Sequence, residues 1–522
     1  MPRRLLLVYL VYFAMIGAGA LILATRAWNS VTHYESSYFF REKLPGGTPI
    51  SERVVLIVLD GIRADAAQEM PRLQELAARG ASGIAVAAEP SLSAPGRAVL
   101  ATGAWPEVNG VTNNSRYETP RLDSIFSLAQ TAGVPRAVAG SYFWKKAFQS
   151  YLDGPVLDFE KELEPGLDSA ALTAWQEKTC AEIQSFLEKQ PKGLLVADLT
   201  AADPAGHDFG GESEEYRKTA IAVDACLGAL VNTLDDGNTT FVVVADHGQI
   251  DRRGRGGHGG SEDEVLNVPL VLAGTAIRPA TGLRVQHVDI APTICAILGL
   301  PLPSANQGVI IWEALDVSES VGLELRTRER EQRRIANSRL PDRVQGRAAE
   351  RESRAGSTIF FWLFLTLVGV WAIILRHADR GFILLMSAVY YGVYYLLFWL
   401  FGLGYSLSAI VREEYTNSFL GLNALAALLA CLVVGALVAR RTPFLGHRMA
   451  FDTAVWLTVT LGLQISVVHY QWGLLMVGFV PDLSASFKAY LDLIQLMVIS
   501  FLTVPFLMAA AFFSSDDRGY AG

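Results

Sequence analysis

Apolar runs of two different lengths divide this chain. Runs of about 20 residues, long enough to cross a bilayer as a helix, predict six membrane spans. The first lies at Leu5–Ala24. The other five are expected at 358–375, 381–403, 417–439, 450–470 and 487–513. The sequence between the first and second spans contains only short apolar runs, which is typical of a globular domain.

Within this middle region, four short apolar runs rich in β-branched residues end at or near polar residues. They are Val54–Leu59, Leu194–Ala197, Phe241–Ala245 and Val268–Leu272. Unbroken runs of this kind are typical of strands buried on both faces of a parallel sheet. Helical patterns alternate with them at 70–79, 122–132, 170–188 and 214–234, and Asp289 is expected to cap another helix. The pattern predicts an α/β fold, a mainly parallel sheet sandwiched by helices, joined to an α-helical transmembrane domain.

Charge in the loops between the spans predicts the orientation. The loops at 376–380 and 440–448 are short and basic, and the alternate loops are not, which places the basic loops in the cytoplasm. The first span is either an uncleaved anchor, which we favour, or a cleaved signal peptide. We expect an integral plasma (inner) membrane protein with both termini cytoplasmic. Its parts are an anchor (1–28), an extracytoplasmic domain (29–316), a charged helical stalk (317–357), five membrane helices (358–513) and a tail (514–522).

Composition narrows the function classes. The chain is 51% hydrophobic with a net charge of −8, and no basic stripe suggests nucleic acid binding. The four cysteines lack metal-binding spacing. A Cys180–Cys226 bridge is compatible with the sequence, but we expect free buried thiols. The Arg- and Glu-rich stretch at 324–354 is expected to be a solvated stalk, with contact to anionic lipid headgroups as the alternative.

Five short polar segments of the middle region contain most of the potential metal ligands. Three of the eight histidines are among them, each beside glycine, which lets the backbone approach a ligand closely. The segments begin at Asp60-Gly61, Pro90, Asp203, Asp246 and Gly257; the ligand candidates are Asp60, Ser93, Asp203, His207, Asp246, His247 and His258.

Three Asp, three His and one Ser suit two divalent ions, with Zn²⁺ favoured over Mn²⁺. Two metals about 4 Å apart stabilise both the attacking and the leaving oxygen of an in-line displacement. A metal-bound Ser93 hydroxyl becomes a nucleophile at neutral pH. Each segment alone has a plain structural explanation, such as a helix cap, but all five in this order predict a phosphoryl-transfer site.

The segments resemble the alkaline phosphatase superfamily over residues 50–315. Within it they are similar to the nucleotide pyrophosphatase/phosphodiesterase branch, and more so to the GPI ethanolamine phosphate transferases. The resemblance rests on Asp60-Gly-Ile-Arg-Ala-Asp65, Ser93-Ala-Pro-Gly-Arg97, Asp203-x-x-Gly-His207, Asp246-His-Gly and His258-Gly. It implies one metal held by Asp203, His207 and His258, and another held by Asp60, Asp246, His247 and the Ser93 oxygen.

Two differences from the family pattern bear on substrate binding. Arg97 stands where the transferases usually have His, so it either contacts the phosphate or packs on the surface. Gly96 stands where the pyrophosphatase branch usually has Asn, which makes a nucleotide substrate less expected. Asn113 and Asn114 are either phosphate-binding residues, Asn114 above all, or plain turn residues.

We therefore expect a phosphoethanolamine transferase that works through a phospho-Ser93 intermediate. Its partners would be a membrane phospholipid donor and a glycolipid or glycan hydroxyl as acceptor. A membrane-anchored phosphodiesterase or phosphatase, in which water resolves the same intermediate, is the alternative. A catalytically inactive membrane scaffold is disfavoured because all seven expected ligand and nucleophile positions are filled.

Overall fold

The computed structural model describes residues 3–115, 118–159, 166–252, 255–340, 380–410, 413–441, 446–473 and 482–516. The chain divides into two compact units. The helical unit comprises Met1–Val31 and Arg343–Gly522, and the globular unit comprises Thr32–Asp342. The predicted span at 358–375 lies outside the described residues.

An eight-stranded sheet with the order β4-β3-β5-β1-β6-β7-β2-β8 forms the centre of the globular unit. All neighbouring strands are parallel except β7, which is antiparallel to both β6 and β2. This arrangement confirms the predicted mainly parallel sheet. The strands are β1 (Arg53–Leu59), β2 (Ala81–Val86), β3 (Arg136–Gly140), β4 (Leu157–Asp158), β5 (Leu194–Leu199), β6 (Thr239–Ala245), β7 (Asn267–Gly274) and β8 (Ala280–Gln286).

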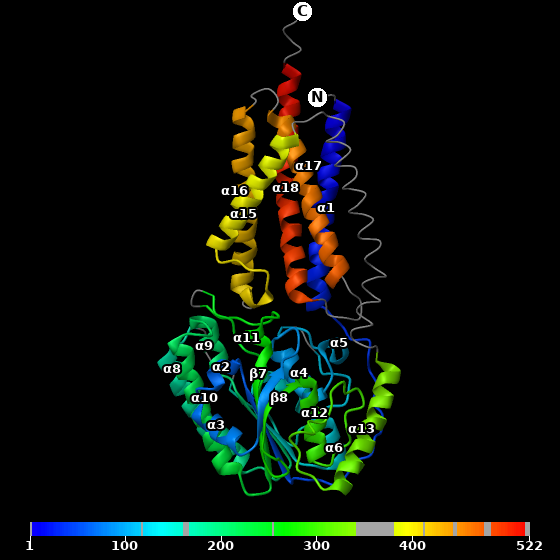
Figure 1. Ribbon diagram of the computed structural model, residues 1–522, viewed down its shortest axis with the longest axis vertical. Coiled ribbons are helices and arrows are strands. Elements are labelled where there is room, and N and C mark those ends of the chain that lie inside the picture. Colours follow the sequence, from blue (N-terminus) through cyan, green and yellow to red (C-terminus); the bar gives the residue numbers. More distant parts are fainter. Residues whose placement is uncertain are drawn as a thin grey trace, which may run out of the picture. The chain divides into compact units, whose positions relative to one another are not determined.

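Helices cover both faces of the sheet, which explains why its central strands are largely apolar. Figure 1 shows one group on one face, namely α2 (Ala64–Ala67), α3 (Pro71–Ala78), α8 (Ser169–Glu188), α9 (Ala202–Phe209) and α10 (Glu214–Leu234). The other face carries α4 (Ser93–Thr102), α5 (Pro106–Asn109), α6 (Ile125–Ala132), α12 (Ile290–Ile297) and α13 (Glu319–Arg339). Two further short helices are α7 (Tyr142–Phe148) and α11 (Asp263–Leu266).

The helix expected after Asp289 is present as α12, but the Asp289 side chain does not cap it. Its carboxylate instead accepts hydrogen bonds from the backbone N–H groups of Gln286 and Val309, at 2.8 and 2.7 Å. The carboxylate therefore joins the end of β8 to the segment at Val309, which lies 20 positions further along the chain.

The expectation of free thiols at Cys180 and Cys226 is wrong. The two cysteines form a disulfide between α8 and α10, with Cα atoms 5.6 Å apart. The charged stretch after residue 317 is helical as α13, and Leu325, Arg328 and Ala336 on this helix are buried in the globular unit. One face of α13 is therefore packed rather than solvated.

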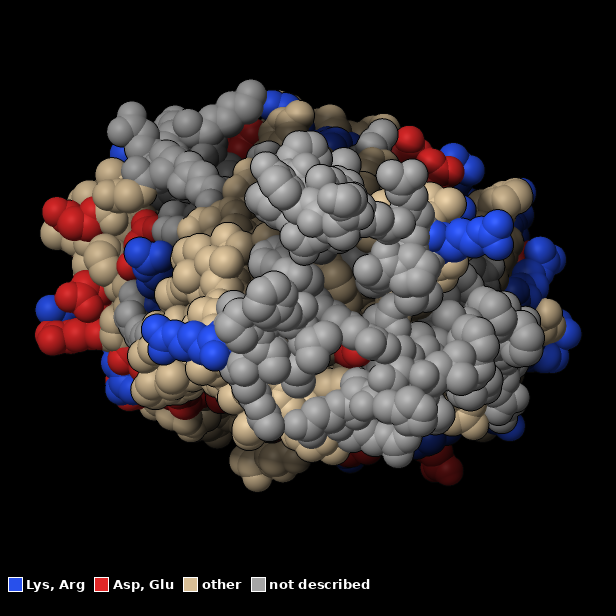
Figure 2. Space-filling view, turned by 90° about the horizontal axis from the view of Figure 1, so that it is seen from above, with Lys and Arg blue, Asp and Glu red and all other residues tan. Residues whose placement is uncertain are grey.

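The helical unit contains five helices that are long and apolar enough to cross a membrane, among the described residues. They are α1 (Arg3–Thr32), α15 (Arg380–Leu400), α16 (Glu413–Arg441), α17 (Gly446–Trp472) and α18 (Leu483–Asp516). The described surface in Figure 2 is mostly uncharged away from its margin. These helices identify the chain as a membrane protein.

Candidate metal and nucleophile site

The register of the central strands places two predicted ligands side by side. β1 and β6 are parallel, with Leu59 opposite Ala245, so Asp60 and Asp246 follow at the same edge of the sheet. Asp246 Oδ1 accepts hydrogen bonds from the backbone N–H groups of Gly61 (3.3 Å) and His247 (3.0 Å). Asp60 Oδ1 and Asp246 Oδ2 are buried and accept no hydrogen bond. Asp60 therefore retains a buried oxygen available to a cation, whereas Asp246 Oδ2 faces the Arg97 guanidinium at 3.2 Å.

Ser93 is the first residue of α4, and its hydroxyl lies at this pair. Ser93 Oγ is 3.0 Å from His247 Nε2. The Asn114 side chain fixes the same turn because its Oδ1 accepts the Ala94 backbone N–H at 2.9 Å. A Cβ at position 96 would lie 2.8 Å from the Asp246 carbonyl oxygen, so Gly96 permits α4 to approach the strand end closely.

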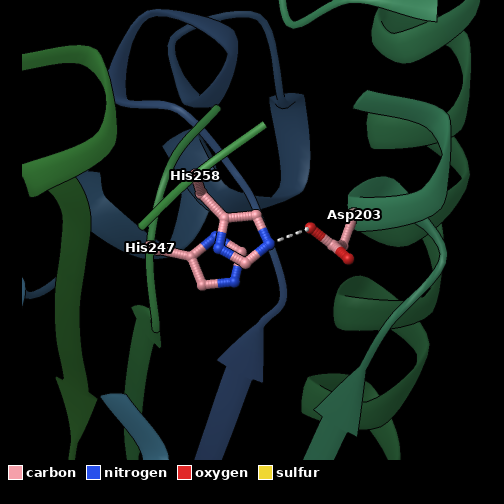
Figure 3. A group of neighbouring side chains, drawn as sticks. All are labelled: Asp203, His247 and His258. Atoms are coloured by element: carbon pink, nitrogen blue, oxygen red, sulfur yellow. Dashed lines mark ion pairs between the residues drawn. The ribbon is translucent and has the colours of Figure 1, made fainter. Parts of the chain in front are cut away.

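A second ligand group lies beside the first. Asp203 and His207 are one turn apart on α9, and His258 comes from the loop before α11. Asp203 Oδ1 is 3.3 Å from His258 Nε2 and 3.4 Å from His207 Nε2. Figure 3 shows His258 lying over the His247 ring with its imidazole directed at Asp203; the two rings stack at 3.6 Å. His247 therefore touches both groups.

Backbone carbonyls orient two of the histidines. His247 Nδ1 donates to the Gly248 carbonyl at 3.0 Å, and His258 Nδ1 donates to the Ser91 carbonyl at 2.9 Å. A carbonyl only accepts, so each Nδ1 carries a proton and each Nε2 is the nitrogen left for the ligand groups. A histidine oriented in this way by a backbone carbonyl is typical of metal sites. The structure thus forms two groups with the geometry to hold a cation, one of Asp60, Asp246 and His247 and one of Asp203, His247 and His258.

The ionisation of these residues reflects burial opposed by neighbouring charges. Burial raises the pKa of Asp60 well above its ordinary value, although Arg97 lowers it. Burial also raises the pKa of Asp246. Burial favours a raised pKa for Asp203 as well, but His207 and His258 lower it on balance. Burial, with His247 beside it, lowers the pKa of His258 well below its ordinary value. Closely packed carboxylates and neutral imidazoles are an environment that a divalent cation stabilises.

Arg97 is buried beneath the first group rather than lying on the surface, contrary to one of the two expectations. Its guanidinium contacts Asp60 Oδ2 at 2.6 Å, Asp198 Oδ2 at 2.8 Å and Asp246 Oδ2 at 3.2 Å. Asp198 also accepts a 2.7 Å hydrogen bond from Trp144 Nε1. Arg97 therefore compensates three buried carboxylates, two of which are predicted ligands.

Three residues of the site were not predicted from the sequence. Asp198 directly follows the apolar run Leu194–Ala197 and lies within β5, where its carboxylate is buried; its place at the end of an apolar run, like that of Asp60 and Asp246, was the available signal. Gln249 follows the Asp246-His-Gly motif, and its Nε2 donates to Asp203 Oδ1 at 2.5 Å. Ser91 Oγ donates to the Gly260 carbonyl at 2.6 Å and accepts the Gly259 N–H at 3.0 Å. No local pattern distinguishes Gln249 or Ser91 from ordinary loop residues.

Asn113 and Asn114 occupy different positions. Asn114 contacts the turn that carries the Ser93 hydroxyl, as described above. Asn113 is turned away from it, since its Nδ2 donates to the Thr32 carbonyl at 3.2 Å and its Oδ1 accepts the Ser115 N–H at 3.1 Å. A phosphate-binding role stays a prediction for both.

The chain matches one family model and several curated relatives in sequence. Residues 54–259 match the family model described as Type I phosphodiesterase / nucleotide pyrophosphatase. GPI ethanolamine phosphate transferase 1 of Emericella nidulans is 27% identical over 336 residues, covering 53% of this chain and 35% of the relative. The catalytic subunit of human GPI ethanolamine phosphate transferase 2 is 24% identical, with coverage of 51% and 28%. The chain therefore spans about a third of the length of the curated relatives it matches.

Two solved structures align with about half of this chain. Murine ectonucleotide pyrophosphatase/phosphodiesterase 5 aligns with 16% identity and a TM-score of 0.40, over 48% of this chain and 96% of that one. The alkaline phosphatase PafA aligns with 14% identity and a TM-score of 0.41, over 52% and 100%.

Proposed function

We propose that the protein is a membrane phosphoethanolamine transferase, because residues 54–259 match a phosphodiesterase family model and the curated relatives are GPI ethanolamine phosphate transferases. Ser93 would take phosphoethanolamine from a membrane phospholipid, and a hydroxyl of a glycolipid or glycan would accept it. The observation that carries the proposal is the placement of Ser93 Oγ 3.0 Å from His247 Nε2, the imidazole shared by both ligand groups. The names of the curated relatives support phosphoethanolamine as the transferred group.

The donor set fits two divalent cations. The buried oxygen Asp60 Oδ1 accepts no hydrogen bond, and it fits this proposal because a buried carboxylate oxygen without a hydrogen bond is costly in the absence of a cation. Mixed nitrogen and oxygen donors favour Zn²⁺. One cation would be held by Asp203, His207 and His258, and the other by Asp60, Asp246, His247 and Ser93. When bound, the cations would lower the pKa of the Ser93 hydroxyl and offset negative charge on the phosphoryl oxygens.

The residues of the chain would carry out the reaction in two displacements. In the first, Ser93 Oγ loses its proton and forms a bond to phosphorus, while the bond from phosphorus to the diacylglycerol oxygen breaks and that oxygen takes up a proton. In the second, the acceptor hydroxyl loses its proton and attacks phosphorus, the phosphorus–Oγ bond breaks, and Ser93 regains its hydroxyl. Asn114, through the Ala94 N–H, would hold Ser93 in line for both steps.

A phosphodiesterase is the second candidate, favoured by the description of the matching family model. In that case water would replace the acceptor in the second displacement, and the first displacement would be unchanged. The residues described above serve both reactions equally. The two candidates differ only in what reaches the phosphorylated Ser93.

We place the globular unit outside the plasma (inner) membrane, with six spans and both termini cytoplasmic. Two independent features support this orientation. The basic loops place the opposite ends of the spans in the cytoplasm. The Cys180–Cys226 disulfide is typical of an oxidising compartment. The predicted division into anchor, catalytic domain, stalk, membrane helices and tail belongs to this proposal.

Incubation of the full chain with phosphatidylethanolamine labelled in its headgroup tests the function. We expect release of diacylglycerol and labelled protein with the wild type. Ser93→Ala should abolish both while retaining bound metal, because six ligand side chains remain. Ser150→Ala, at an exposed serine of the same unit, is the matched control. Normal turnover by Ser93→Ala would exclude Ser93 as nucleophile, and label recovered only as free phosphoethanolamine with every glycolipid tested would favour the phosphodiesterase.

A further inference from the structure

A polar cavity of about 380 Å³ lies in the globular unit, outside the groups of metal-ligand candidates. Its volume is within the range of about 300–1,000 Å³ common for small-ligand sites. The lining comes from three stretches of chain: the segment that follows α1, the region from α5 to residue 121, and α7. None of the ligand or nucleophile candidates lines it, so it has no assigned role.

One wall of the cavity is the segment from Thr32 to Tyr38, which is held firmly in place. Tyr34 OH donates to the Glu107 carbonyl and Ser36 Oγ donates to the Val108 carbonyl, both at 2.7 Å. Thr32 is also the last residue of the membrane helix α1. This wall therefore begins at the residue where α1 ends.

The cavity is joined to the nucleophile by a single short loop. Asn113 donates to the Thr32 carbonyl in the cavity wall, Ser115 lines the cavity, and Asn114 between them accepts the N–H of Ala94. Ala94 directly follows Ser93. One side of this loop thus contacts the turn of the nucleophile, and the other borders the cavity.

The lining chemistry indicates a neutral ligand rich in hydroxyl groups. Two carboxylates, Glu35 and Glu118, are matched by two permanent cations, Arg121 and Lys146. A balanced lining does not favour a polyanion such as a nucleotide, and its polar character does not favour an acyl chain. Hydroxyl and carboxylate groups hydrogen-bond sugar hydroxyls, and the two tyrosines of the first wall add amphipathic ring surface.

We propose that this cavity binds the sugar part of the acceptor, one loop (Asn113–Ser115) away from the turn that carries Ser93. The inference rests on the proposed transferase function and names the subsite that the function requires. Binding there raises the local concentration of the acceptor hydroxyl at the phosphoryl group and so favours transfer over hydrolysis by water.

Two substitutions test the cavity, and the chain supplies a matched control. Thr119 lies exposed in the lining, so Thr119→Trp narrows the cavity at little cost to folding. Lys146→Ala removes a hydrogen-bond donor from the lining. Lys145, its neighbour on α7, is equally exposed but does not line the cavity, so Lys145→Ala is the control.

Binding is measured by saturation-transfer NMR with mannotriose and maltotriose at millimolar concentration, using the full chain in detergent micelles. We expect saturation of sugar protons by the wild type and by Lys145→Ala. Binding should weaken by about tenfold in Thr119→Trp, with a smaller loss in Lys146→Ala. Absence of saturation with both sugars, or equal saturation in Thr119→Trp and wild type, would overturn the proposed subsite.

A transfer assay separates this inference from the proposed function. With labelled phosphatidylethanolamine and diglucosyl diacylglycerol, the ratio of transfer to hydrolysis should fall in Thr119→Trp through a raised KM for the glycolipid. Wild-type protein that releases no diacylglycerol would refute the transferase itself. Wild-type protein that transfers label with an unchanged ratio in Thr119→Trp would refute only the acceptor subsite.

Discussion

Replacement of Arg97 by Met should destabilise the metal-free protein more than the metal-loaded protein. The guanidinium contacts Asp60, Asp198 and Asp246 within 3.2 Å, and its side chain is 3% exposed. Removing one partner of a buried ion pair costs about 3–5 kcal/mol because the opposite charge remains buried. For the globular unit, Thr32–Asp342, an unfolding entropy of about 2.1 cal/mol/K per residue converts that loss into a fall in Tm of about 5–8 °C.

Metal should reduce the effect because bound cations would compensate Asp60 and Asp246, leaving only Asp198 unpaired. The measurement is thermal unfolding of the purified full chain, with EDTA and with Zn²⁺. Arg97→Lys serves as a comparison, since one ammonium keeps the charge but loses the planar fork that reaches three carboxylates.

The double variant Arg97→Met/Asp198→Asn identifies the source of the stabilisation. The double variant removes the Asp198 carboxylate, which is not part of either ligand group. We therefore expect it to be more stable than Arg97→Met alone, with a coupling free energy between the two substitutions of about 0.5–3 kcal/mol. An equal fall in Tm with and without Zn²⁺, or no recovery in the double variant, would show that Arg97 stabilises the site by packing rather than by charge compensation.

Three other changes have defined outcomes. Cys180→Ser/Cys226→Ser opens a bridge across 46 residues and should lower the free energy of unfolding by about 2–4 kcal/mol, measured as a fall in Tm that wild type shows only with reductant. EDTA should abolish turnover and lower Tm, with recovery on adding Zn²⁺; activity that persists without metal would refute the metal assignment. Gln249→Leu removes the donor that orients Asp203 and should reduce metal affinity by about 10–100-fold by titration, whereas unchanged affinity would make Gln249 structural only.

The fold was predictable because its main signal is local. The strand runs that end at Asp60 and Asp246 are unbroken, and a parallel register then brings the two carboxylates together. The same local signal did not identify Asp198, a site residue that lies within strand β5. Asp198 was interpreted as the residue after an apolar run. Nothing in the sequence shows that Arg97, which lies on α4 and 101 positions earlier in the chain, contacts its carboxylate. The Asp198 carboxylate can be buried because the Arg97 guanidinium, which compensates its charge, is buried beside it.

The disulfide and the cavity were beyond prediction for a related reason. Cys180 and Cys226 lie on two helices whose sequences do not show that they pack side by side, so the pairing depends on tertiary contacts. The cavity requires the segment after α1 to lie along the region from Glu107 to Val108, and the hydrogen bonds that hold it there join residues more than 70 positions apart. Long-range contacts of this kind have no local sequence signal.

The charges of the site bear on the kind of phosphate it accepts. Asp198 and Arg97 form a neutral pair beneath the site, which leaves Asp60, Asp203 and Asp246 to face the bound cations. Two divalent cations would exceed these three carboxylates by one positive charge while the histidines and the Ser93 hydroxyl are neutral. A phosphodiester carries one negative charge and would bring the buried site to neutrality, whereas a phosphomonoester dianion would leave an uncompensated charge in it. By cancelling the charge of Asp198, Arg97 would therefore make a phosphodiester, such as the proposed phospholipid headgroup, a better match for the site than a phosphomonoester.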